Sequence, residues 1–168
     1  MANEGRKRTD VPRAGLSRCA GGVVVHPEGD RVLLGRLTPN PGYGDLEWTH
    51  AKGRLEGNDP AAAALREVRE ELGAEAEIVS ELPGWFEGST TSNKYFVMRW
   101  VREAGRPDAE TAEVRWVSWD EAPALIRRGR RGRAVTRDLA VLEEARRAWA
   151  AGGGGCPTSA GQHAGQEG

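Results

Sequence analysis

Hydrophobic and polar positions follow one another in blocks that predict a regular series of strands and helices. The largely apolar stretches Val23–Val25 and Arg31–Leu37 flank the turn sequence Pro27-Glu28-Gly29-Asp30, which predicts a β-hairpin. Residues 39–53 are rich in Pro and Gly and predict a long loop interrupted by Leu46 and Trp48. Three later stretches have the pattern of strands: Glu75–Phe86, Asn93–Val101 and Val114–Ser118.

Helical spacing and capping residues predict three helices. Pro60–Leu72 is the clearest, because Asp59 can cap its first turn, Pro60 suits the first helical position and Gly73 ends it. The sequence Ser118-Trp-Asp-Glu121 has the form of a capping box, and Val135–Ala150 has apolar residues at helical spacing. The order of elements predicts an α+β or mixed-sheet domain with helices packed on the sheet.

Composition limits the ordered part of the chain to one domain over residues 16–150. Residues 151–168 contain seven glycines and no Leu, Ile, Val or Phe, so they cannot bury enough apolar area to offset chain entropy. Residues 1–15 are similarly polar, and we expect disordered tails at both ends.

The balance of charges argues against a membrane or a nucleic acid as the main partner. The 168 residues carry 24 basic and 25 acidic side chains, a net charge of −1, so no strong field favours either surface. No apolar stretch approaches the roughly 20 residues of a membrane helix, and the N-terminus lacks the apolar run of a secretory signal. With two cysteines, Cys19 and Cys156, a reducing cytoplasmic setting is the expectation.

The helix Pro60–Leu72 carries the first candidate chemistry. On a wheel of about 100° per residue with Leu65 at zero, Ala61, Val68 and Leu72 fall within about 60° and form an apolar stripe. Three glutamates lie away from this stripe, at about 140°, 200° and 240°: Glu70, Glu67 and Glu71.

Such a face has two interpretations. Repulsion between the like charges and the placement of carboxylates near the helix C-terminus together destabilise the helix by about 1 kcal/mol. A divalent cation bound by these carboxylates would make the same arrangement favourable. Alternatively, the glutamates form an ordinary solvated face that Arg66 and Arg69 neutralise.

The residues before this helix connect it to a known family. From Gly53 to Ala74 the sequence resembles the Nudix box, whose second half is matched by Arg66-Glu67-Val68-Arg69-Glu70-Glu71-Leu72-Gly73-Ala74. The first half is one residue short, so the box glutamate is replaced by Asn58 or Asp59. A deletion within the helix would rotate the carboxylates by about 100° relative to the core, so we place it in the loop Glu56–Asp59.

The resemblance implies a Nudix fold and a hydrolase acting on a nucleoside diphosphate linked to another moiety. It implies that Glu67, Glu70 and Glu71 hold Mg²⁺ or Mn²⁺, together with the backbone carbonyl of Lys52, and that Arg66 orients the glutamates. The metal would polarise phosphoryl oxygens and lower the pKa of the attacking water. A carboxylate would take the proton, and which one is left open.

Several residues outside the helix are weaker candidates, each with an ordinary structural alternative. Candidates for contact with substrate are Lys52, Arg54, Arg36, Tyr43, Trp48 and His50, of which the cations could be solvated and Trp48 and His50 could be core residues. Glu110 and Glu113 precede a predicted strand, where the resemblance implies an extra metal ligand or base; surface residues are the alternative.

We therefore expect a magnesium-dependent pyrophosphohydrolase for a nucleoside triphosphate or a dinucleoside polyphosphate, with a homodimer left open. Two other functions remain. A nucleotide-sensing module without catalysis is disfavoured by the intact Arg66 and glutamates. An RNA 5′-end pyrophosphohydrolase could use the five arginines of Arg127–Arg133, although this run is more simply a solvated turn.

Overall fold

A computed structural model describes residues 8–39, 47–129 and 132–152. Within these ranges no helix is long and apolar enough to span a membrane. The elements in chain order are β1 (Arg8–Thr9), β2 (Ser17–Val25), β3 (Arg31–Leu37), β4 (Trp48–Thr49), β5 (Ala51–Arg54), α1 (Pro60–Leu72), β6 (Ala74–Glu81), β7 (Trp85–Glu87), β8 (Thr91–Glu103), β9 (Thr111–Ser118), α2 (Ala122–Ile126) and α3 (Arg133–Ala151).

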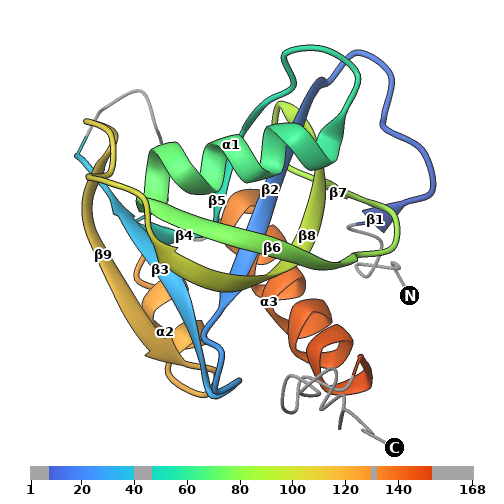
Figure 1. Cartoon of the computed structure of the whole chain (residues 1–168). Helices are drawn as coiled ribbons and strands as arrows, with labels where there is room; N and C mark the ends of the chain where they lie inside the picture. Colours follow the sequence, from blue (N-terminus) through green and yellow to red (C-terminus); the bar gives the residue numbers. More distant parts are fainter. Residues whose placement is uncertain (1–7, 40–46, 130–131, 153–168) are drawn as a thin grey trace, which may run out of the picture.

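The strands form one mixed sheet whose main path runs β1-β7-β8-β2-β3-β4 (Figure 1). The long central strands β2 and β8 are parallel, and the other pairs are antiparallel. β2 pairs with β3 at Val24 and Val25, while its first half pairs with β5. β4 pairs with β3. The segment 48–54 therefore extends the sheet along both strands, with β4 on β3 and β5 on β2, where β2 and β3 no longer pair with each other.

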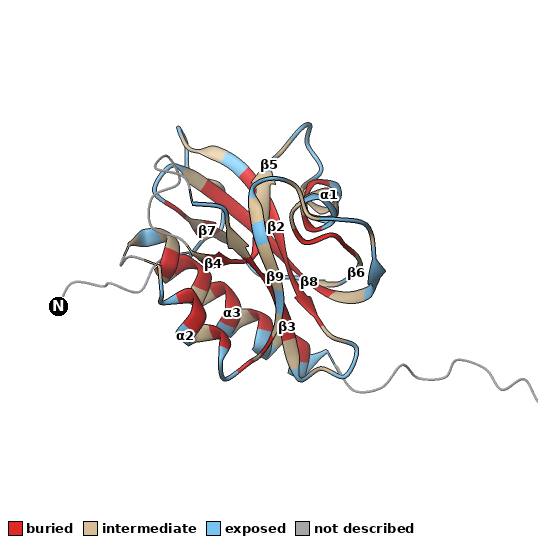
Figure 2. Cartoon of the chain, turned by 90° about the vertical axis from the view of Figure 1, so that its left-hand side faces the viewer, coloured by how far each residue is buried: buried red, intermediate tan, exposed pale blue. Residues whose placement is uncertain are grey.

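Helices cover both faces of the sheet, which is the mixed sheet sandwiched by helices that the Nudix resemblance implies. Figure 2 shows the strands between α1 on one side and α2 and α3 on the other. Alternation along β2 supplies both cores, because Val23 and Val25 pack on the side of α3, whereas Ala20 and Val24 pack under α1. The expected α+β fold with a mixed sheet between helices is confirmed.

Local chemistry sets the ends of α1 where the sequence predicted them. The Asp59 carboxylate accepts hydrogen bonds from the backbone N–H groups of Ala61 (3.0 Å) and Ala62 (3.3 Å). At the other end Gly73 adopts the left-handed conformation, with φ 59° and ψ 34°, and its N–H donates to the Arg69 carbonyl. The capping box is formed in part, since Ser118 Oγ accepts the Glu121 N–H at 3.2 Å.

The structure differs from the expected boundaries at three places. The predicted strand 75–86 is two strands, β6 and β7, because Leu82-Pro83-Gly84 turns the chain and Gly84 has φ 77°. β4 and β5 lie in the predicted long loop. Within the expected N-terminal tail, Arg8–Thr9 forms β1 against β7, and Arg8 reaches Glu144 of α3 at 3.4 Å. Residues 1–7 and 153–168 lie outside the described part of the chain.

Candidate active site

The orientation of α1 differs from the predicted one and changes where its glutamates lie. The helix buries Ala63, Ala64, Val68 and Leu72, whereas Leu65 is 37% exposed. The predicted stripe was centred on Leu65; the buried side is centred closer to Ala64 and Val68. Glu71 is nearly in line with Ala64 on the helix, so it lies at the edge of the buried face instead of on the solvent side.

Glu67 lies directly over the backbone of Gly53 in β5. A Cβ atom at position 53 would overlap the Glu67 carboxylate, so this placement of the Glu67 side chain requires glycine at position 53. Burial raises the pKa of Glu67, and the hydrogen bond from Arg66 opposes this rise. Gly53 therefore provides the space in which the Glu67 carboxylate sits.

Glu71 is bound to the free edge of the same strand. Its Oε2 accepts the backbone N–H of Lys52 at 2.9 Å. In the described part of the chain β5 pairs only with β2, so this N–H is outside the sheet ladder. Burial raises the pKa of Glu71 to about 8, and the Lys52 hydrogen bond only partly offsets it. The neutral form of this carboxyl therefore persists to higher pH than that of an ordinary glutamate.

Arg66 ties α1 to the end of β5. Its Nη2 donates to Glu67 Oε1 at 3.1 Å and to the Arg54 carbonyl at 2.9 Å. Its other guanidinium nitrogen lies 3.5 Å from Glu56. This geometry supports the predicted role of Arg66 in orienting a glutamate, which is Glu67. Glu70 is exposed on the next turn.

Asp108 is a further carboxylate at the site that the sequence analysis missed. Its backbone N–H donates to the Glu70 carbonyl at 2.8 Å, which fixes it beside the C-terminal end of α1. The negative charge of Asp108 contributes to raising the pKa values of both Glu67 and Glu71. No sequence motif marks this residue; only its position in the acidic loop before β9 hinted at a carboxylate there.

The two glutamates predicted near that loop have other surroundings. Glu113 accepts hydrogen bonds from Arg115 (2.8 Å) and Arg36 (3.2 Å), and both lower its pKa. Gly35 faces Leu72 of α1, so its neighbour Arg36 points to the other face of β3. Arg36 and Glu113 thus form an ion pair away from α1. The Glu110 N–H donates to Asp108 Oδ1 at 3.1 Å.

Two predicted substrate contacts are core residues in the structure. Trp48 is 1% exposed, and the guanidinium of Arg115 lies 4.8 Å from the centre of its ring. His50 is also 1% exposed, and its Nε2 lies 3.1 Å from the Asp138 carbonyl of α3. Both side chains therefore pack within the protein. Tyr43 and part of the arginine run, residues 130–131, lie outside the described ranges.

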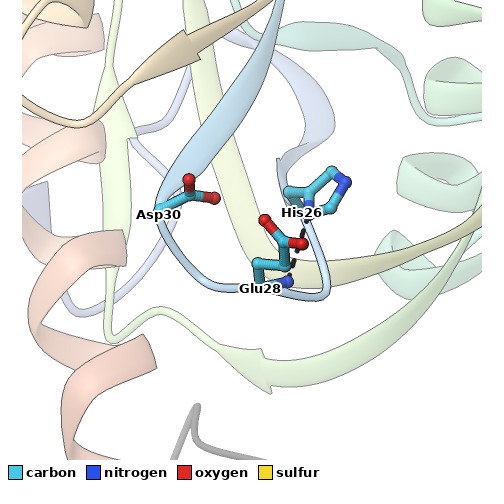
Figure 3. Close-up of side chains that lie close together, drawn as sticks. All are labelled: His26, Glu28 and Asp30. Carbon is cyan, nitrogen blue, oxygen red and sulfur yellow. Dashed lines mark hydrogen bonds between the residues drawn. The ribbon is translucent and has the colours of Figure 1, made fainter.

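A separate group of possible metal ligands lies in the β2–β3 hairpin, far along the chain from α1. His26, Glu28 and Asp30 bring ligand atoms within 4.8 Å of one another (Figure 3). Arg31 already occupies their midst: its guanidinium lies 2.9 Å from Asp30, 3.1 Å from Glu28 and 2.9 Å from His26 Nε2. Arg31 therefore fills the position that a metal ion would take in this turn and balances one of its two carboxylate charges.

The carboxylates beside β5 fit a divalent cation better. Glu67 and Glu71 are half-buried acids with raised pKa values, and the charge of Asp108 contributes to raising both. Carboxylate and backbone oxygens are the ligands that Mg²⁺ and Mn²⁺ prefer. A cation would offset the mutual repulsion and burial of these groups, so the residues present suit the metal that the Nudix-box resemblance implies.

Comparison with known proteins places this geometry in context. A family model described as "NUDIX domain" matches residues 16–139. An RNA pyrophosphohydrolase of Gluconacetobacter diazotrophicus is 36% identical over 83 residues, covering 46% of this chain and 49% of that protein. An RNA pyrophosphohydrolase of Acidiphilium cryptum is 29% identical over 129 residues, which cover 62% of this chain and 77% of that protein. The chain thus spans about half the length of the first of these relatives.

Solved structures share the fold at low sequence identity. A NUDIX hydrolase from Nitrosomonas europaea has a TM-score of 0.62 with 20% identity, covering 82% of this chain and 90% of that one. A C. elegans Ap4A hydrolase in a binary complex has a TM-score of 0.57 with 20% identity, and the match covers 81% of this chain and 96% of that one. At this identity the likeness supports the architecture alone.

Proposed function

Because this chain belongs to the NUDIX family, we propose that it is a pyrophosphohydrolase that uses a divalent cation to cleave a phosphoric anhydride bond. The substrate class is a nucleoside diphosphate linked to another moiety. The observation that carries the proposal is the pair of half-buried carboxylates, Glu67 and Glu71, held against the backbone of Gly53 and Lys52.

Each residue of the site has a part in this proposal. Glu67, Glu70, Glu71 and the Lys52 carbonyl would hold Mg²⁺ or Mn²⁺, with Asp108 adding negative charge beside them. The bound metal polarises phosphoryl oxygens and lowers the pKa of the attacking water. Arg66 keeps Glu67 in place, and a carboxylate of the cluster accepts the proton of the water. The Lys52 and Arg54 side chains leave β5 on the face opposite Glu67, and they would contact substrate phosphates that extend past the edge of the strand.

Two substrate types are supported by specific observations. A nucleoside triphosphate or dinucleoside polyphosphate agrees with the net charge of −1, which gives no general attraction for nucleic acid. RNA with a 5′-triphosphate is the second candidate, because both sequence relatives are named RNA pyrophosphohydrolases. The buried thiol of Cys19 agrees with a cytoplasmic setting, which is also part of this proposal.

A substrate screen in ¹⁸O-labelled water tests the activity. Nucleoside triphosphates, dinucleoside polyphosphates and 5′-triphosphate RNA are incubated with Mg²⁺, Mn²⁺ or excess EDTA, and the products are read by mass spectrometry. We expect turnover only with the cation, with the label on the attacked phosphorus. Full turnover in EDTA, or none of any substrate with either cation, would contradict the proposal.

Salt dependence separates the two substrate types. An RNA substrate contacted along several phosphates loses affinity steeply as salt rises, whereas a small nucleotide held at one site loses much less. A preference for RNA over the free triphosphate that disappears between about 50 and 200 mM salt supports 5′-triphosphate RNA as the substrate. Equal KM values for the free triphosphate and the RNA end at both salt concentrations support the small-molecule reading.

A further inference from the structure

A pocket with a volume of about 360 Å³ lies at the N-terminal end of α1. Figure 1 shows this end of the helix on the side of the molecule where β7 lies. The lining residues come from β2, from β7 and from the segment that joins β5 to α1: Arg18, Leu55, Gly57, Asn58, Pro60 and Trp85. Pockets that bind small molecules have volumes of about 300–1,000 Å³, so this one suits a single small group.

The pocket lies on the same face of the sheet as the Glu67 carboxylate. Leu55 packs with the core under α1, and its N–H donates to the Arg18 carbonyl at 3.0 Å. Leu55 follows Gly53 by two residues, so its side chain lies on the same face about 7 Å further along. Ala20 belongs to the same core, which places Arg18 on this face as well. The pocket is therefore next to the space over Gly53 that Glu67 fills.

Arg66 connects the pocket with the carboxylates. Its guanidinium donates to Glu67 Oε1 and to the Arg54 carbonyl, and it lies 3.5 Å from the Glu56 carboxylate. Glu56 belongs to the segment that lines the pocket. A substrate with a phosphate at the carboxylates can therefore reach the pocket past one guanidinium, a group that itself attracts phosphate.

Two polar side chains of the pocket are available to a ligand. Arg18 and Asn58 are exposed, and their side chains make no hydrogen bond or ion pair with the residues that the structure describes. The shortened first half of the box explains why Asn58 is available. Asp59 uses its carboxylate to cap α1, so Asn58 is left to line the pocket. Its amide can donate and accept hydrogen bonds at once.

Trp85 provides a flat apolar surface in the pocket. Its neighbour Phe86 packs on the side of α3, so the indole of Trp85 points to the side of α1. The buried Lys94 lies 5.9 Å from the centre of the indole ring and is itself paired with Glu81 at 2.9 Å. A partly exposed indole supported in this way is a surface on which a nucleobase can stack.

We propose that this pocket binds a nucleobase of the substrate. The base stacks on Trp85 and bonds Asn58 at its edge, and Arg18 binds the phosphate next to the same nucleoside. The inference rests on the proposed function for its phosphate-bearing ligand, and it deepens that function by assigning the part of the substrate that is not cleaved.

Mononucleotides in EDTA test the pocket without requiring turnover. The four nucleoside 5′-monophosphates and ribose 5-phosphate are titrated into the ¹⁵N-labelled full chain, and the indole N–H signals of the six tryptophans are followed by NMR. Trp85→Leu identifies the Trp85 signal. Trp100→Leu identifies a matched, partly exposed tryptophan on the same face of the sheet. We expect at least one nucleotide to shift the Trp85 signal and leave that of Trp100 unchanged.

Affinities of the variants assign the parts of the ligand. Wild type should bind the preferred nucleotide about tenfold more tightly than ribose 5-phosphate, and Trp85→Leu should remove this preference. Asn58→Ala should raise the Kd of the preferred nucleotide and leave the other nucleotides nearly unchanged. Arg18→Gln should raise the Kd of all nucleotides and of ribose 5-phosphate alike, by about tenfold. Arg128→Gln, which changes an exposed arginine after α2, should match wild type.

Kinetics with Mg²⁺ identify which base of a substrate occupies the pocket. A KM for nucleoside triphosphates that rises about tenfold in Trp85→Leu assigns the nucleoside at the near end of the phosphate chain. A rise confined to dinucleoside polyphosphates, or to 5′-triphosphate RNA of two or more nucleotides, assigns the base beyond it. Either result supports the inference.

Two results overturn the inference: a Trp85 signal that no mononucleotide shifts at millimolar concentration, or Trp85→Leu with unchanged nucleotide preference and KM. If mononucleotides bind at Trp85 but no substrate is hydrolysed, the proposed function fails and the nucleotide pocket stands. Hydrolysis without any response at Trp85 has the opposite meaning. If Trp85→Leu does not fold, Trp85→Phe identifies the signal, and Asn58→Ala and Arg18→Gln still decide.

Discussion

Gly53 and Glu67 show how one missing side chain creates the site. The carboxylate of Glu67 occupies the volume that a Cβ at position 53 would fill, and Arg66 holds that carboxylate from the side. Glu71 is fixed one residue away by the Lys52 N–H. The positions of these two carboxylates therefore depend on the backbone of a two-residue segment.

Gly53→Ala should separate activity from stability. The methyl group meets the end of a flexible Glu67 side chain, which can move aside, so we expect the free energy of unfolding to fall by only about 1 kcal/mol. Turnover should fall by about a hundredfold, because the displaced carboxylate no longer has the productive geometry. Urea unfolding and steady-state kinetics measure the two effects. An equal loss of stability and turnover in free-energy terms, or no loss of either, would contradict the role assigned to Gly53.

Metal affinity should depend on pH through Glu71. Its pKa of about 8 means that below this value a cation must displace a proton, so the Kd for Mg²⁺ should fall as pH rises to about 8 and then level off. The sign for stability is opposite. In EDTA the folded protein holds a proton that the unfolded chain loses above its ordinary pKa, so stability declines from about pH 4.5 to pH 8, by at most about 1.4 kcal/mol per pH unit.

Calorimetry from about pH 6 to pH 9, in buffers of different ionisation enthalpy, counts the released protons. Glu71→Gln should release none at this position. A wild-type Kd that is independent of pH below 8 would show that Glu71 is already ionised without the metal.

At the scale of elements, α1 shows what the sequence could and could not predict. Asp59, Pro60 and Gly73 act through local hydrogen bonds and backbone geometry, so both ends of the helix were predictable. Its rotation was not, because Ala63 and Ala64 leave the apolar stripe ill defined, and packing against β2 and β5 decided which side is buried. Likewise, the burial of His50 depends on Asp138, 88 residues away.

Two substitutions in α1 distinguish the observed rotation from the predicted one. Val68 is fully buried, so Val68→Ala should lower the free energy of unfolding by about 2 kcal/mol. Leu65 is 37% exposed, so Leu65→Ala should lower it by less than about 1 kcal/mol. Denaturation in urea compares the two. A larger loss of stability for Leu65→Ala than for Val68→Ala would instead support the predicted apolar stripe centred on Leu65.

At the scale of the whole molecule, the sheet brings charged side chains from segments that are far apart in the sequence to one strand. β5 has carboxylates of α1 on one face and the cations Lys52 and Arg137 on the other. The Nudix-box resemblance predicted the first face, since its residues are contiguous in sequence. Asp108 and Arg137 could not be predicted, because only the turn before β9 brings Asp108 beside α1, and only the packing of α3 brings Arg137 near Lys52 of β5.

The most direct test of the account is Glu71→Gln, measured with and without Mg²⁺ beside the exposed control Glu77→Gln. The change keeps the shape of the side chain but removes the charge. We expect turnover to fall by at least about a thousandfold, and the rise in melting temperature that Mg²⁺ gives to wild type to be largely lost. Glu77→Gln should match wild type in both. Near-normal turnover and an unchanged Mg²⁺ response in Glu71→Gln would contradict the claim that this buried carboxylate holds the catalytic metal.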